Sequence, residues 1–154
     1  MYLTNYRLTG FLLCCLSLIA CHSQSTSYIV PSVDQVLLLC PPTPNCVSSD
    51  AASDDAEHWT PPLEIAMPAD QAWPLILAEL ESMPRTRIIS RTENEVHAEV
   101  KSAVFGFVDD LVLRLKGNQL TLYSASRVGY SDLGVNRKRV NLLVDELQQK
   151  SIVR

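Results

Sequence analysis

Four consecutive segments, joined by short turns, constrain the fold of this chain more than any other feature. They cover residues 86–91, 96–104, 107–116 and 119–127. Most of them alternate between apolar and polar side chains, as where Val96 and Ala98 flank His97. Gly106 and the pair at 117–118 (Gly-Asn) mark tight turns. Because such short turns join antiparallel neighbours, the four segments predict an antiparallel meander.

Two amphipathic helices flank this meander in the sequence. The first is predicted over residues 70–83, with Asp70 as its N-cap and Pro84 as its end, and the second over residues 135–150. Their apolar stripes are Trp73, Ile76, Leu77 and Leu80, and Val140, Leu143, Val144 and Leu147. The prediction is therefore an α+β fold, in which a four-stranded antiparallel meander carries both helices on one face.

The first 20 residues have the pattern of a signal peptide. A short region with a single arginine precedes an apolar stretch over residues 8–20, which is too short for a comfortable membrane span. It ends in Leu18-Ile19-Ala20-Cys21, which resembles a bacterial lipobox. That resemblance implies cleavage before Cys21 and acylation of this cysteine by diacylglycerol and an amide-linked chain such as palmitate. The alternative is an ordinary secretory signal followed by a coincidental cysteine. His22, where an aspartate is the usual signal for inner-membrane retention, favours the outer membrane and a periplasm-facing protein.

The cysteines fit an oxidising compartment. Once the signal is removed and Cys21 is acylated, Cys40 and Cys46 remain, and the turn-rich segment between them allows a disulfide. Neither a redox motif nor zinc-ligand spacing is present, so no cofactor or metal is expected. The predicted organisation is a lipidated cysteine and tether over residues 21–39 and one domain over residues 40–150. An irregular, disulfide-closed arm precedes the meander.

Charge is divided unevenly along the predicted mature chain. Residues 21–84 carry nine acidic residues and no lysine or arginine, whereas residues 85–154 have a net charge of +4. An acidic protein of this kind does not fit nucleic acid as a partner. The basic C-terminal half can still bind an anion.

Three segments together resemble a known family. They are 44–49 (Pro-Asn-Cys-Val-Ser-Ser), 105–110 (Phe-Gly-Phe-Val-Asp-Asp) and 124–139, which runs from Ser-Ala-Ser-Arg to Asn-Arg-Lys-Arg. They are similar to the family called domain of unknown function 1499, over about residues 40–150. Tyr123 stands where the family pattern usually has arginine. The resemblance implies the domain and no particular activity.

Asp109 and Arg127 form the first candidate site. Asp109 shares a strand face with Leu111 and Leu113, so it is expected to be partly buried and to need a partner. Arg127 ends the next strand, and a structural Asp109–Arg127 pair is the favoured interpretation over a general base or metal ligand. The serines at 124 and 126 have no base in a recognisable triad, so they are interpreted as structural.

The start of the second helix forms the other candidate site. Ser131, Asp132 or Asn136 can cap it, and Asn136 and Arg137 are expected to face inward. Cations at a helix N-terminus are unfavourable on dipole grounds, so the basic run at 137–139 needs compensation. Either acidic side chains supply it, in a salt-bridge network, or a bound anion does.

Three functions follow from these candidates. The first is a lipid-anchored binding or interaction module without catalysis, with an anion-binding loop at Arg127, Asn136, Arg137, Asp109 and Asp132. The second is an envelope enzyme acting on an anionic or phosphorylated substrate at an Asp/Arg cluster. The third is a structural accessory of an envelope complex, with an unidentified envelope protein as its partner.

Overall fold

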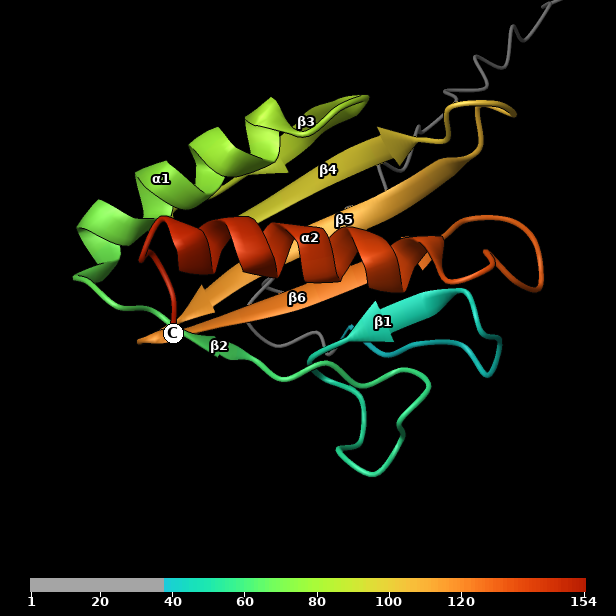
Figure 1. Ribbon diagram of the computed structural model, residues 1–154, viewed down its shortest axis with the longest axis horizontal. Helices are drawn as coiled ribbons and strands as arrows, with labels where there is room; N and C mark the ends of the chain where they lie inside the picture. The colour runs from blue at the N-terminus through green and yellow to red at the C-terminus, as the bar shows by residue number, and fades with distance from the viewer. Residues whose placement is uncertain (1–37) are drawn as a thin grey trace, which may run out of the picture. The chain divides into compact units, whose positions relative to one another are not determined.

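A computed structural model of the protein describes residues 38–154. The predicted signal peptide, Cys21 and most of the tether lie outside the described residues. The elements, in chain order, are β1 (Cys46–Ser48), β2 (Leu63–Glu64), α1 (Ala69–Ser82), β3 (Thr86–Arg91), β4 (Glu95–Lys101), β5 (Val108–Lys116), β6 (Gln119–Ser126) and α2 (Val135–Gln149) (Figure 1).

One antiparallel sheet organises the domain. Its strands lie in the order β1-β6-β5-β4-β3, and β2 pairs with β6 beside β1. β3 to β6 form the predicted meander, and both helices cover one face of it (Figure 1). Alternate residues of β4, β5 and β6 point toward the helices and form the core with the apolar stripes of α1 and α2. The prediction of an α+β fold with an antiparallel sheet and two helices is confirmed.

The strand count predicted from the sequence is wrong, because the sheet has six strands rather than four. The two additional strands are short pieces of the arm, and both pair with the outer edge of β6. Cys46 lies opposite Ala125, and Leu63 lies opposite Leu120. Segments of three and two residues are too short to show an alternating pattern, so their pairing depends on the edge that β6 offers.

The arm is closed as predicted. Cys40 and Cys46 form a disulfide with their Cα atoms 5.5 Å apart. Ser48 Oγ donates a hydrogen bond to the carbonyl of Leu38, and the backbone N–H of Ser49 donates to the carbonyl of Leu122. The disulfide and these hydrogen bonds hold the arm against β6.

The helix ends differ in detail from the prediction. Pro68 is the N-cap of α1, so the prediction of Asp70 as the cap is wrong, and Asp70 lies in the first turn. After α2 the chain turns back to the sheet, where Ile152 and Val153 are buried. No helix among residues 38–154 is both long and apolar enough to span a membrane.

Candidate functional site

The loop before α2 is organised by Asp132. Its carboxylate accepts hydrogen bonds from the backbone N–H groups of Gly134 (2.9 Å) and Asn136 (2.7 Å). Gly134 is the N-cap and has φ of 78°, a left-handed conformation that glycine adopts without strain. The carboxylate therefore stabilises the positive end of the helix dipole. Asp132 was one of the three residues predicted from the sequence to cap this helix.

Asn136 lies at the centre of a buried polar network. It is 1% exposed, as its predicted inward orientation requires. Its side-chain oxygen accepts hydrogen bonds from Ser124 Oγ and from Arg139 Nη1. Its side-chain nitrogen donates to Ser126 Oγ and to the carbonyl of Asn45, both at 3.0 Å. One amide thus joins α2, β6 and the arm, and the two serines have structural roles, as the sequence suggested.

Asp109 completes this network. It is 4% exposed on the helix-covered face of β5, and Arg139 Nη2 donates to its Oδ2 at 2.6 Å. Arg139 Nη1 also donates to Ser124 Oγ at 2.9 Å. The buried charge is therefore compensated by an opposite charge that is itself held by hydrogen bonds, the arrangement that a buried ion pair requires.

The predicted Asp109–Arg127 pair is wrong. Asp109 lies opposite Ser126 in the register of β5 and β6, so Arg127, the next residue, points to the other face. There Arg127 binds Asp110 through Nε (3.0 Å) and Nη2 (2.7 Å), and Glu99 through Nη1 (2.8 Å). The basic partner of Asp109 is instead Arg139 of α2.

The helix-free face carries a second polar cluster, around Asp110. His97 Nε2 donates to Asp110 Oδ1 at 2.7 Å, beside Arg127. Partial burial alone would raise the pKa of the Asp110 carboxyl, but hydrogen bonds from Arg127 and His97 outweigh it and lower the pKa. Burial, together with the charge of Asp110, raises the pKa of Tyr123 on the same face. The lowered pKa keeps the Asp110 carboxylate charged at neutral pH beside the guanidinium of Arg127.

Arg137 lies apart from both clusters. Its Nη1 donates to the carbonyl of Trp59 at 2.8 Å, and its Nη2 donates to the carbonyl of Glu57 at 2.9 Å. Within the described part of the chain, no carboxylate forms an ion pair with this guanidinium. Arg137 therefore joins α2 to the arm through backbone carbonyls, without an ion pair in the described residues.

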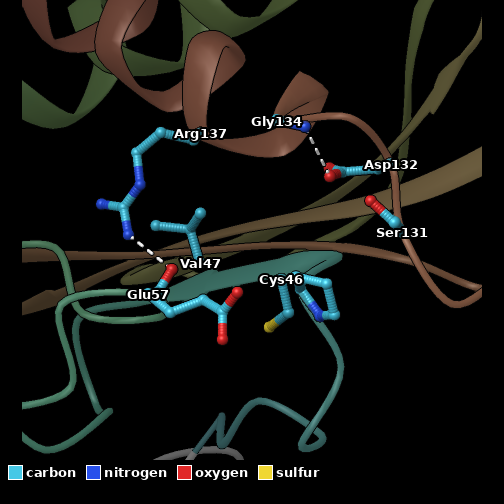
Figure 2. A pocket seen from close by; sticks show the side chains of 8 residues that line it. Cys46, Val47, Glu57, Ser131, Asp132, Gly134 and Arg137 are labelled. Atoms are coloured by element: carbon cyan, nitrogen blue, oxygen red, sulfur yellow. Dashed lines mark hydrogen bonds between the residues drawn. The ribbon is translucent and has the colours of Figure 1, made fainter.

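A pocket of about 280 Å³ opens beside Arg137. Figure 2 shows Arg137 on one side of it, the Asp132–Gly134 loop on another, and Cys46 and Val47 of β1 behind. The side chain of Glu57 lines the side that the arm forms. Both oxygens of Asp132 accept backbone hydrogen bonds from the α2 loop, and Arg137 is the cation among the lining residues.

His58 joins two segments of the arm to each other. Its Nδ1 donates to Asp55 Oδ2 at 2.7 Å, and its Nε2 donates to the carbonyl of Thr43 at 3.2 Å. Both bonds require a proton on the ring nitrogen, so the imidazolium fits the site. Burial alone would lower the pKa of His58, but these hydrogen bonds outweigh it and raise the pKa. The hydrogen bond from His58 lowers the pKa of Asp55.

The structure therefore separates the five candidate residues into three places. Asp109 and Asn136 belong to the network under α2, Arg127 to the opposite face, and Arg137 to the pocket. Asp132 belongs to two of these places, because it bonds Asn136 and also lines the pocket. Asn45 and Arg139 were not predicted from the sequence as site residues. Arg139 follows Asn136 by three residues and precedes Leu143 by four, so the helical period itself placed it on the buried face.

Across residues 38–154 no group of three or more histidine, cysteine, aspartate or glutamate side chains has the arrangement of a metal site. Fold and site together define a small α+β domain in which a disulfide-closed arm is joined to a helix N-terminus by buried polar groups. The profile of one family, described as protein of unknown function (DUF1499), matches residues 36–147, so the chain belongs to that family. No curated protein matches the chain.

Proposed function

We propose that this protein is a lipid-anchored, periplasm-facing protein of the outer membrane and a non-catalytic binding module for a small anion. The observation that carries the binding role is Arg137, whose guanidinium forms no ion pair among residues 38–154 and lies in the wall of a pocket of about 280 Å³. A phosphate or carboxylate oxygen is the group that such a donor recognises. Gly134, the N-cap of α2, lines the same pocket.

The buried network supports a module without catalysis. The side chains of Ser124, Asn136 and Asp109 form their hydrogen bonds within the network. Ser124 donates to Asn136, and Arg139 donates to Ser124 and Asp109. A nucleophile or general base needs a reactive atom that a substrate can reach, and these atoms are enclosed. Their role is to hold the arm and the α2 loop at a fixed distance across the pocket.

The alternative of an enzyme with an Asp109/Arg127/Arg137 cluster loses its geometric basis. Asp109 lies under α2, Arg127 lies on the opposite face, and Arg137 contacts the arm. The three side chains therefore do not surround one substrate.

The binding role is tested by titrating inorganic phosphate into the full-length protein and following backbone amide shifts by NMR. We expect saturable shifts in the Asp132–Gly134 loop, which Arg137→Gln abolishes and Arg137→Lys retains in part. Lys138→Gln is the matched control, because Lys138 is exposed on the same helical turn. Absence of saturable shifts in the wild type, or equal shifts in Arg137→Gln, would refute anion binding at this pocket.

The anchor is tested separately through Cys21. The lipobox predicts that Cys21→Ser prevents acylation and removes the protein from the fraction that is extracted with outer-membrane lipoproteins. Mass spectrometry of the wild-type N-terminus should show acyl chains on Cys21. A wild-type chain without acyl chains would exclude lipidation, whatever the outcome of the phosphate titration.

A further inference from the structure

Two exposed loops leave the sheet at the same end. Residues 102–107 connect β4 to β5, and residues 127–134 connect β6 to α2 (Figure 1). At their bases the N–H of Arg127 donates to the carbonyl of Val108 at 3.3 Å, so the two loops begin side by side. We call the surface formed by residues 102–107 and 127–134 the loop end.

Large apolar side chains are concentrated at the loop end, and they point into solvent. The most exposed are Leu133 (93%), Val104 (81%), Phe105 (76%), Tyr130 (73%), Val128 (58%) and Phe107 (54%). The rings of Phe105 and Phe107 stack with centroids 5.6 Å apart. A cluster of exposed aromatic and aliphatic side chains on short loops is unfavourable in water and marks an interaction surface.

Three cations lie next to the two loops in the chain or by hydrogen bonding. Lys101 ends β4 immediately before the first loop, and Arg85 is joined to it by a hydrogen bond from Nε to its carbonyl. Lys138 is exposed in the first turn of α2, where its N–H bonds to the carbonyl of Gly134. None of these three cations forms an ion pair with a carboxylate between Leu38 and Arg154. The loop of residues 102–107 contains no charged residue.

We propose that the loop end docks the domain onto a phospholipid bilayer, with the loop tips entering the interface and the cations meeting anionic headgroups. This inference rests on the proposed function, because the acylated Cys21 supplies the bilayer. The 16 residues between Cys21 and Leu38 span at most about 55 Å when fully extended, which leaves the domain within reach of its own membrane.

The chemistry of the surface favours a bilayer over a protein. Aromatic rings are enriched at the level of the lipid headgroups, and unpaired cations beside them gain energy from anionic lipid. The acylated cysteine and a weakly binding protein surface reinforce each other, because tethering raises the local concentration of the second site. Docking would fix the orientation of the domain on the bilayer. It would thereby also fix the direction that the pocket beside Arg137 faces relative to the membrane.

The test uses the full-length, acylated chain, reconstituted into vesicles of phosphatidylethanolamine and phosphatidylglycerol. Part of the lipid carries bromine on its acyl chains, which quenches tryptophan on contact. Phe105→Trp places a reporter on a loop tip, and Leu75→Trp places one on the exposed side of α1. The wild type supplies the background from Trp59 and Trp73. We expect that brominated lipid removes most of the fluorescence added by Phe105→Trp and leaves that added by Leu75→Trp unchanged.

Adding Lys101→Glu and Lys138→Glu to the reporter chain should reduce the quenching, as should replacing phosphatidylglycerol by phosphatidylcholine. Equal quenching of both reporters, or none at Phe105→Trp, would overturn the docking. A third outcome would also overturn the docking. If the emission of Phe105→Trp shifts to the blue without quenching, another protein or a second copy of the chain buries the loop tip instead of lipid. Acylation is measured by mass spectrometry on the same sample, so failure of the anchor and failure of the docking are read independently.

Discussion

Asp109 and Asp110 are neighbours in the chain and lie in opposite environments. Asp109 is under α2, 4% exposed, and pairs with Arg139, whose guanidinium also bonds Ser124 and Asn136. Asp110 lies on the helix-free face, where Arg127 and His97 reach it from positions open to solvent. Both are ion pairs at hydrogen-bond distance. Because the N···O distances are nearly equal, we expect burial to decide how much each pair contributes to stability.

Removing the cation of the buried pair should have the largest effect. Arg139→Ala leaves the Asp109 carboxylate enclosed without a counter-charge, and we expect the free energy of unfolding to fall by about 3–5 kcal/mol. Urea denaturation measures this difference. Lys138→Ala, one residue earlier on the exposed side of α2, should change stability by less than about 0.5 kcal/mol. A loss below about 1 kcal/mol for Arg139→Ala would mean that the buried pair does not hold the fold.

Removing the amide at the centre of the same network should cost less, because no buried charge is left alone. Asn136→Ala should lower the free energy of unfolding by about 1–3 kcal/mol, since it removes partners of Ser124 and Asp132. Asn141→Ala, at an exposed position of the same helix, is the matched control for helix propensity. Equal effects of the two substitutions would show that the network adds nothing beyond the helix itself.

On the helix-free face, removing the cation should change the pKa of Asp110 more than it changes the free energy of unfolding. Asp110 has a lowered pKa, so its stabilising contribution is present above about pH 3.9, its ordinary range, and is lost as pH falls through the lowered pKa. Arg127→Ala should raise the pKa of Asp110 and destabilise less than Arg139→Ala does. Carboxyl ¹³C NMR across an acid titration measures the pKa. An unchanged value in Arg127→Ala would exclude Arg127 as its cause.

The smallest effect should come from the ion pair in the arm. The pKa of His58 is raised, so its contribution is complete below about pH 6.5 and is lost as pH rises through the raised value. Imidazole NMR shifts should follow this titration, and amide exchange in the arm should accelerate over the same range. Asp55→Asn should lower the pKa of His58. If amide exchange in the arm follows only its intrinsic pH dependence through that range, the charged His58 does not fasten the arm.

Much of the candidate site was visible in the sequence through strand alternation. The period of two that placed Leu120, Leu122 and Ser126 on one face also placed Arg127 on the other. The same rule placed Asp109 inward with Leu111. The proposed Asp109–Arg127 pair therefore contradicted the alternation on which the strands were predicted, and that alternation should have ruled it out.

The pairing of the arm was not visible in this way. β1 and β2 are too short to carry a periodic signal, and they become strands because β6 would otherwise present an unpaired edge. The partners of Arg137 are backbone carbonyls of Glu57 and Trp59, and a backbone carbonyl has no residue type that a sequence pattern could reveal.

The sequence by itself determined the helices, the four-strand meander, the disulfide and the inward orientation of Asp109 and Asn136. Periods of 3.6 and 2 residues and the turn residues express these properties locally. Only the tertiary structure decided that Arg139 neutralises Asp109, that Asn45 joins the arm to α2, and that Arg137 is left at a pocket. These outcomes depend on how α2 crosses the sheet, because the crossing sets which side chains from distant segments come within hydrogen-bond distance.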